Sequence, residues 1–395
     1  MLIRGAHVVT PGRDLGVTSV EVFGGKIVRM GDSPMPSPSG ETLEADGLLL
    51  LPGFVDIHSH GRGGADFCDA TDAAFEKIGR GKLADGVTSF LATGLTRPEE
   101  DLAELCRCAA RYMAKCTVPT RGATCLGVHL EGPFFNQKMA GAQNPAYLRK
   151  PDVGFVDRLN AIAPVRKVSY APELDGAIEF TSGLRARGIV ASLGHSEADY
   201  DTFERARAAG ATHLTHFCNA MMPIHHLRPS MVTGGMLADD VYAEIITDGV
   251  HLSDPMIRLI AKTKGPDRVM VITDAMCAAG EPDGIYSLGG LRVRVEKGRA
   301  TLADVPYDPK AVVSNVAGSV ALYPQCVKRW VRASGLPLEE AVKALGFNQL
   351  RSLGIADRGD IKVGQAADLV LLDANLDPVR TILRGETAWS RDAAG

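Results

Sequence analysis

The sequence predicts an α/β protein, a (β/α)8 TIM-type barrel with a small β-sandwich domain formed from both termini. Three observations support this fold class. Through the middle of the 395-residue chain, eight short apolar runs alternate with room for helices, which is typical of a parallel sheet. Both ends of the chain carry short β-like pieces instead. Polar side chains follow one apolar run after another, as they do at the active-site rim of a barrel.

The two ends of the chain have similar patterns. The first 50 residues contain AHVVT, SVEVF and GGKIVRMGD, and the last 40 contain GDIKVGQAADLVLLD and VRTILRGETAW. We expect these pieces to form one β domain from residues 1–52 plus 356–395, which leaves residues 53–355 for the barrel. A barrel of about 250 residues or more with an accessory domain fits the chain length.

The eight predicted barrel strands all come from the middle of the chain. They are FVDIHSH (54–60), TSFLATG (88–94), CLGVHLEG (125–132), KVSYAPE (167–173), IVASLGH (189–195), THLTHF (212–217), AEIITDGVH (243–251) and RVMVITDA (268–275). Amphipathic stretches at 98–116 and 197–210 predict helices between them. An open doubly wound sheet is the alternative, but it would normally show a glycine-rich phosphate turn, and HSHGRGG is not GxGxxG.

Composition narrows the function classes. The net charge is −4 and no basic block occurs, so we expect neither a nucleic acid nor a membrane partner. No apolar run approaches the ~20 residues that span a bilayer. The segment MLIRGAHVVTPGRD lacks a signal peptide's apolar core, and the eight cysteines are irregularly spaced without a CxxC pair. We therefore expect reduced thiols and a cytoplasmic location.

Six of the predicted strands end on residues able to bind metal or move protons. They are His58 and His60, His129 and Glu131, His195, His216, His251, and Asp274. Strand side chains alternate, so His58 and His60 face the same side and can reach one ion. Taken alone, HxH is explained equally well by two satisfied histidines. Asp274 comes after four apolar residues and Thr273 and would be costly to bury unpaired, which favours a metal or a proton-transfer task. This N/O set suits Zn²⁺, with Fe²⁺ or Mn²⁺ as alternatives.

Several motifs, in matching order, resemble a known family. PGFVDIHSHGRGG, GVHLEGPFF, SLGHSEADY, THLTHFCNAM, DGVHL, ITDAM and VAGS are similar to the N-acetylglucosamine-6-phosphate deacetylase family of the amidohydrolase superfamily, and its galactosamine counterpart is also close. The fourth strand ends YAPE, without the lysine that many members carboxylate into a bridging ligand. That points to the branch that uses the third-strand glutamate.

The resemblance implies a metal-dependent deacetylase that hydrolyses the acetamide of N-acetylglucosamine 6-phosphate or N-acetylgalactosamine 6-phosphate in amino-sugar catabolism. It implies one or two ions and a homodimer. Glu131, His195 and His216 would hold the principal metal, and His58, His60 and Asp274 would complete a second site. Asp274 would move the proton from water to the leaving amine, and His251 would stabilise the oxyanion. The substrate would contact Ala142, Gln143, Asn219, Ala220, His226, Arg228, His251, Ala317, Gly318 and Ser319.

Two departures from the family pattern bear on specificity. Gln143 stands where the family usually has a histidine. The chain reads HHLRPS where the family usually reads HHREPG, so Leu227 replaces the phosphate-binding arginine and Arg228 follows it. A guanidinium binds phosphate through a bidentate fork, and leucine cannot. A deacylase for an unphosphorylated or otherwise different N-acyl sugar is therefore an alternative.

Two further alternatives stay open at this stage. Another amidohydrolase activity, a cyclic amidase or a deaminase, is opposed by HLEGP together with NAM. A non-catalytic scaffold on a hydrolase barrel is opposed by the complete set of ligand positions, because decayed relatives lose metal ligands.

Overall fold

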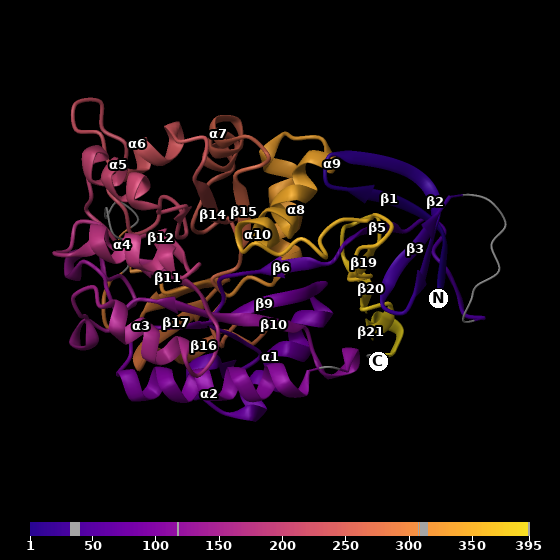
Figure 1. Cartoon of the computed structure of the whole chain (residues 1–395), viewed down its shortest axis with the longest axis horizontal. Coiled ribbons are helices and arrows are strands. Elements are labelled where there is room, and N and C mark those ends of the chain that lie inside the picture. Colours follow the sequence, from indigo (N-terminus) through magenta and orange to yellow (C-terminus); the bar gives the residue numbers. More distant parts are fainter. Residues whose placement is uncertain (32–39, 117, 307, 309–314, 394–395) are drawn as a thin grey trace.

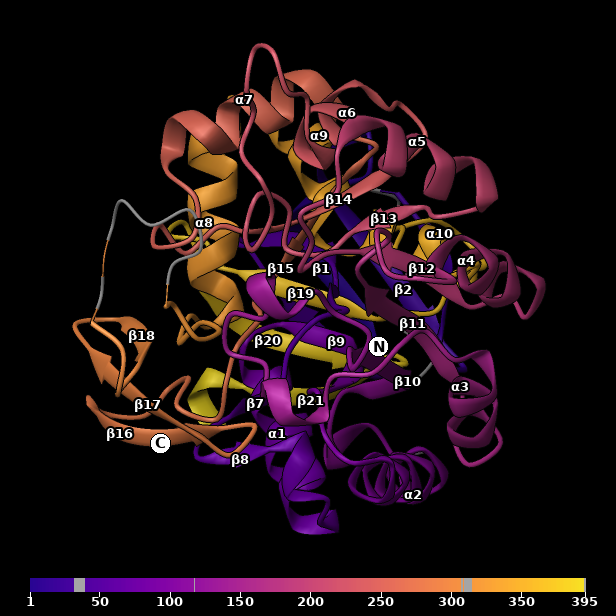
Figure 2. The same ribbon diagram turned by 90° about the vertical axis from the view of Figure 1, so that its left-hand side faces the viewer.

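The computed structural model describes residues 1–31, 40–116, 118–306, 308 and 315–393. Eight strands form the central sheet: β6 (Phe54–Asp56), β9 (Val87–Gly94), β10 (Thr124–Glu131), β11 (Val165–Tyr170), β12 (Val190–Leu193), β13 (His213–Leu214), β14 (Tyr242–Ile246) and β15 (Val269–Ile272). Each strand pairs in parallel with the next along the chain. The predicted barrel is confirmed (Figures 1 and 2).

The two ends of this sheet, β6 and β15, meet through the segments that follow them. The Asp274 backbone N–H donates to the His58 carbonyl at 2.9 Å, and the His60 N–H donates to the Ala275 carbonyl at 2.8 Å. Asp56, buried at the end of β6, accepts hydrogen bonds from Lys82 and from the Thr273 hydroxyl. These contacts close the carboxyl end of the barrel and fix the segments that carry three predicted ligands.

Helices surround the barrel, as Figure 2 shows. They are α1 (Asp72–Ala84), α2 (Glu99–Lys115), α3 (Val153–Asn160), α4 (Ala177–Ala186), α5 (Tyr200–Ala209), α6 (Met231–Leu237), α7 (Asp254–Lys264), α8 (Tyr323–Ser334), α9 (Leu338–Ala341) and α10 (Phe347–Ser352). The predicted helices at 98–116 and 197–210 appear as α2 and α5. Helix α2 buries Leu102, Leu105, Ala109 and Tyr112, the spacing of one helical face. None of the described helices is long and apolar enough to cross a membrane.

A second eight-stranded sheet joins the two ends of the chain, at the right of Figure 1. Its strands are β1 (Leu2–Thr10), β2 (Arg13–Phe23), β3 (Lys26–Met30), β4 (Thr42–Glu44), β5 (Leu49–Pro52), β19 (Leu369–Leu372), β20 (Pro378–Leu383) and β21 (Glu386–Ser390). Strand β5 pairs with β1 on one side and β19 on the other. Ile3, Val20, Leu369 and Ile382 share a separate buried cluster. That core supports our proposal that residues 1–52 plus 356–395 form one domain and 53–355 the other.

An antiparallel sheet that the sequence analysis did not anticipate lies beside the rim of the barrel. It consists of β16 (Gly284–Leu288), β17 (Leu291–Glu296) and β18 (Arg299–Leu302), between β15 and α8. Leu288 packs in one cluster with Leu95, Met276 and Ala317. The sheet therefore covers one side of the region where the barrel strands end (Figure 2).

Candidate metal centre and active site

Four barrel strands deliver a polar residue two positions beyond their last residue. His58 follows β6, His195 follows β12, His216 follows β13 and Asp274 follows β15. Glu131 is the last residue of β10. All five therefore lie at the carboxyl end of the barrel, where barrel active sites are found.

The backbone at this rim is strained. His195 and Asp274 both have a φ of 50° and His216 has a φ of 30°, which L-residues rarely adopt. Each such residue costs about 1–3 kcal/mol and persists only where the surrounding structure holds it. The chain thus accepts strain in order to aim these side chains inward.

The first group of ligand-type residues is Glu131, His195 and His216. Glu131 Oε1 lies 3.4 Å from His195 Nε2 and 3.3 Å from His216 Nε2, and the two Nε2 atoms are 2.9 Å apart. His195 Nδ1 donates to the Met139 carbonyl at 2.8 Å, and His216 Nδ1 donates to the Asn219 carbonyl at 3.2 Å. Both Nε2 atoms then present lone pairs beside a carboxylate, which is the arrangement a divalent cation requires.

The second group is His58, His60, Glu131 and Asp274. His60 Nε2 lies 3.1 Å from both Glu131 Oε2 and Asp274 Oδ1. His58 Nε2 lies 3.2 Å from Glu131 Oε1 and 3.4 Å from Asp274 Oδ1, yet it has no hydrogen-bond partner among the described residues although it is buried. In both groups the ligand atoms lie within 4.8 Å of one another, so each group could hold a metal ion and Glu131 belongs to both.

The carboxylates of the site are charged despite their burial. Burial alone would raise the pKa of Glu131, but the adjacent histidines, His58 first, hold it well below its usual range. Burial likewise opposes the charge on Asp274, and His58 and His60 outweigh it, so its pKa is lowered. Burial lowers the pKa of His216, which favours its neutral, metal-binding form. His58 and His60 behave differently: against their burial, Glu131 and Asp274 raise the pKa of His58 to about 9 and the pKa of His60 well above its ordinary value. Without a cation, protons on these two rings balance the carboxylates, and a divalent cation fits the place of those protons.

A pocket opens directly onto these groups. Its empty volume is about 550 Å³, counting open solvent at its mouth. Together with His60, Glu131, His195, His216 and Asp274, it is lined by Leu95, Gly141, Ala142, Gln143, Asn219, Ala220, His251, Leu288, Val316 and Gly318. Of the predicted substrate-binding residues, six lie in this wall: Ala142, Gln143, Asn219, Ala220, His251 and Gly318.

Ala317 and Ser319 lie beside the pocket and are buried. The Ser319 hydroxyl donates to the Thr273 carbonyl at 2.6 Å, and its backbone N–H donates to the Asp274 carbonyl at 2.8 Å. In the structure this serine supports the strained Asp274 segment. A direct contact between Ser319 and substrate stays a prediction.

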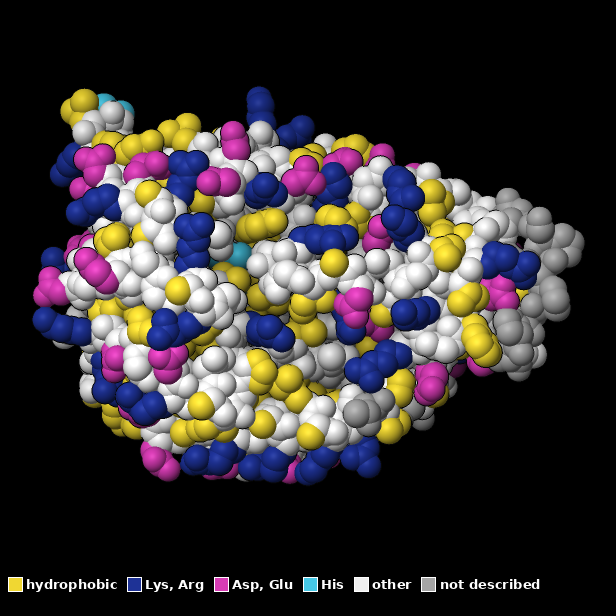
Figure 3. Space-filling view, in the orientation of Figure 1, with side chains coloured by type: hydrophobic (Ala, Val, Ile, Leu, Met, Phe, Trp, Pro, Cys, Tyr) yellow, Lys and Arg dark blue, Asp and Glu magenta, His cyan; other side chains and the backbone are white. Residues whose placement is uncertain are grey.

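His226 and Arg228 are not brought to the pocket of their own chain. They lie in the exposed loop between β13 and α6, where Leu227 is 77% exposed. This loop projects at the upper left of Figure 1, and Figure 3 shows hydrophobic and histidine side chains at its tip. That these residues bind substrate also stays a prediction, and it would require contact with the pocket of a second copy.

Gln143 does more than line the pocket. Its Nε2 donates to Glu131 Oε2 at 2.6 Å, while its Oε1 accepts from the Thr96 backbone N–H at 2.8 Å. Because Thr96 fixes the amide orientation, the donor end faces Glu131. Gln143 thus holds the carboxylate shared by both groups.

The sequence analysis missed two carboxylates that contact the site histidines. Asp248 Oδ2 accepts from His251 Nδ1 at 2.8 Å. Glu244 Oε2 accepts from His58 Nδ1 at 3.1 Å. Both had a signal in the sequence, because they are the two acidic residues within the predicted strand AEIITDGVH.

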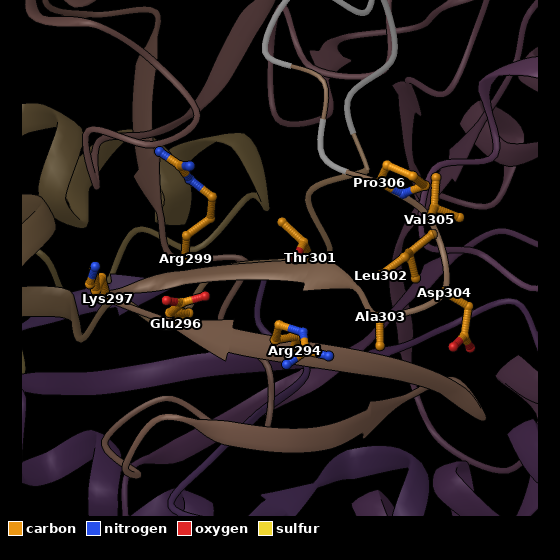
Figure 4. Close-up of a pocket in the computed structure, with 10 residues that line it drawn as sticks. All are labelled: Arg294, Glu296, Lys297, Arg299, Thr301, Leu302, Ala303, Asp304, Val305 and Pro306. Atoms are coloured by element: carbon orange, nitrogen blue, oxygen red, sulfur yellow. The ribbon is translucent and has the colours of Figure 1, made fainter.

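A wider hollow lies on the three-stranded sheet, with an empty volume of about 1240 Å³ on the same measure. Figure 4 shows Arg294, Glu296 and Arg299 on its strands, with Val305 and Pro306 across the gap. None of the metal-ligand groups found among the described residues lies there. The larger hollow is therefore not the candidate active site. The smaller pocket, which opens onto the ligand groups, is.

The amidohydrolase family profile matches residues 49–392 of the chain. The chain belongs to the amidohydrolase family. An N-acetylglucosamine-6-phosphate deacetylase from Lysinibacillus sphaericus is 33% identical over 98% of this chain and 97% of its own length. An N-acetylgalactosamine-6-phosphate deacetylase from Escherichia coli O157:H7 is 32% identical over 89% of this chain and 91% of its own.

Solved structures similar to this chain include deacetylases of the same kind as the relatives. The N-acetyl-D-glucosamine-6-phosphate deacetylase from Mycobacterium smegmatis, a mutant in complex with N-acetyl-D-glucosamine-6-phosphate, has a TM-score of 0.89 and 34% identity over 99% of both chains. The resemblance drawn from the motifs is confirmed. Members of the amidohydrolase family are metal-dependent, and the groups that share Glu131 are where this amidohydrolase could bind metal.

Proposed function

We propose that this amidohydrolase is a deacetylase that hydrolyses the acetamide of N-acetylglucosamine 6-phosphate or N-acetylgalactosamine 6-phosphate in amino-sugar catabolism. The observation that carries the proposal is one pocket in which two ligand groups share Glu131 beside Asp274 and His251. The names of the relatives support the substrate class. Their matches over almost the whole chain disfavour a cyclic amidase or a deaminase.

The metal assignment follows the two groups. Glu131, His195 and His216 would hold the principal ion, and His58, His60 and Asp274 would complete a second position. Zn²⁺ suits this N/O set best, with Fe²⁺ or Mn²⁺ as alternatives. When bound, such an ion would polarise a carbonyl and lower the pKa of water from its bulk value to ~7.

Two side chains carry the proton chemistry. Asp274 is ionised, so its carboxylate accepts the proton of the attacking water and passes it to the amine nitrogen. That transfer is needed because an unprotonated amine is a poor leaving group. His251 donates from Nε2 to the developing oxyanion, while its Nδ1 stays on Asp248.

We expect Asp248→Asn to move the alkaline limb of the pH profile to lower pH. Burial lowers the pKa of His251, but Asp248 outweighs it and raises that pKa above its ordinary value. Donation from Nε2 with Nδ1 on Asp248 needs the protonated ring, so activity is lost as pH rises through this raised pKa. The neutral amide of this variant would remove the negative charge that stabilises the protonated His251 ring. Activity would then fall at a lower pH. The pH dependence of kcat/KM measures it, and an unchanged alkaline limb would exclude this role for Asp248.

The 6-phosphate requirement tests the proposal itself. Rates on N-acetylglucosamine 6-phosphate, N-acetylgalactosamine 6-phosphate and the two free sugars should be compared with each metal supplied singly. We expect kcat/KM on a phosphorylated sugar to exceed that on its free form by at least about tenfold. The exposed Leu227 favours the opposite result, a deacylase for an unphosphorylated or different N-acyl sugar, and a preference for free sugar would establish that alternative.

We also propose a homodimer. The exposed loop that carries His226 and Arg228 supports this, because its apolar tip, with Ile224 and Leu227 half or more exposed, would be covered by a second copy. In that arrangement Arg228 of one copy would approach the substrate of the other.

A further inference from the structure

A buried ion pair lies directly beneath the second ligand group. Glu244 on β14 and Lys167 on β11 are both fully buried inside the barrel. The Lys167 ammonium donates to Glu244 Oε1 in a short contact. The other oxygen, Oε2, lies 3.1 Å from His58 Nδ1. The proposed mechanism uses neither residue.

Stability does not explain why this pair is present. Barrel interiors are filled mainly by branched apolar side chains. Replacing a buried ion pair by apolar residues of similar volume is often neutral or stabilising. The Glu244–Lys167 pair therefore has some other role, and its position under His58 indicates which.

The hydrogen bond to Glu244 fixes the His58 tautomer. A carboxylate paired with an ammonium carries no proton, so it can only accept, and His58 Nδ1 must be the donor. Against burial, Glu131 and Asp274 raise the pKa of His58 to about 9, so a bound ion would displace the Nε2 proton and leave the Nδ1 proton on Glu244. Nε2 then carries a lone pair. That lone pair faces Glu131 Oε1 at 3.2 Å and Asp274 Oδ1 at 3.4 Å, which is the direction of the second ligand group.

We propose that Glu244 is a positioning residue that keeps the Nε2 lone pair of His58 directed at the second metal position. Lys167 holds Glu244 in register from the opposite side. The pair thereby determines how tightly the second ion is held. This inference rests on the proposed metal-dependent function only in that the second position binds a cation.

Glu244→Gln provides a sharp test. Lys167 still needs an acceptor, so the amide oxygen faces Lys167 and the amide NH₂ faces His58 Nδ1. His58 must then carry its proton on Nε2, where it blocks metal ligation. We expect affinity for the second equivalent of Zn²⁺ to fall by about 10- to 100-fold while the first equivalent is unchanged. Zinc titration with metal analysis of the dialysed protein measures both.

A double variant separates this mechanism from general damage. In Lys167→Met/Glu244→Gln no ammonium competes for the amide oxygen, so the amide turns and its oxygen accepts from His58 Nδ1. We expect affinity for the second equivalent to recover most of its loss. Asp368→Asn, which neutralises a buried carboxylate paired with Arg358 in the terminal sheet, is the matched control and should retain both equivalents. Unchanged affinity in Glu244→Gln, or no recovery in the double variant, would overturn the proposal.

The native protein gives an independent reading if the variants fail to fold. Histidine ¹⁵N chemical shifts, with the His58 signals assigned by comparison with His58→Gln, show which ring nitrogen carries the proton. In the zinc-loaded protein we expect a protonated Nδ1, and a proton on Nε2 alone would refute the inference. Neither measurement uses substrate, so an enzyme that fails to deacetylate amino sugars leaves these results unaffected.

Discussion

Asp274→Asn should lose about 10²- to 10⁴-fold in kcat while zinc stays bound to Glu131, His195 and His216. The amide keeps the shape of the carboxylate but cannot accept a proton from water or return one to the amine. Steady-state rates together with metal content measure this result.

Asp85→Asn is the matched control for that experiment, because Asp85 is also buried but pairs with Arg62 and belongs to neither ligand group. It should leave kcat almost unchanged. Full turnover in Asp274→Asn would remove Asp274 as the proton carrier, and loss of the principal ion would show that it acts through metal binding instead.

Glu131→Gln should remove both ions and with them nearly all activity. Glu131 belongs to both ligand groups and is the carboxylate that faces all four histidines. A neutral amide leaves the principal group without an anionic ligand, so we expect zinc affinity to fall by more than the roughly 100-fold that outer contacts contribute. Metal analysis after dialysis provides the measurement.

Gln143→Met gives the graded comparison, since it removes one hydrogen bond to Glu131 Oε2 and leaves the charge. It should weaken metal binding by only about 10- to 100-fold. If Glu131→Gln retained two tightly bound ions, the ligand assignment would be wrong, and zinc-free wild-type protein would favour the scaffold alternative.

The barrel could be predicted from the sequence because each strand is marked by a pattern of neighbouring residues. Apolar runs bounded by polar residues identify parallel strands, and the carboxyl ends of such strands meet at one rim. The element bounds were less accurate. The first strand was expected to run to His60 but ends at Asp56, so His58 and His60 lie in the segment after it. They still face one site because backbone hydrogen bonds to Asp274 and Ala275 fix the position of that segment.

Other features depend on contacts between distant parts of the chain. LRVRVE in β17 has the alternation of a half-buried strand, with Val293 and Val295 buried and Arg294 exposed, but it lies outside the strand–helix alternation. The contact between Glu244 and Lys167 joins residues 77 positions apart. The orientation of Gln143 depends on the Thr96 backbone. No periodicity reveals such partners.

The sharing of Glu131 has a thermodynamic consequence. Because one carboxylate faces both cation positions, filling either one changes the free energy of filling the other. Thermodynamic linkage requires that an ion in the first position change the affinity of the second position by the same factor as an ion in the second position changes that of the first. Metal loading should therefore follow a cooperative or anticooperative curve, which two independent dissociation constants cannot describe.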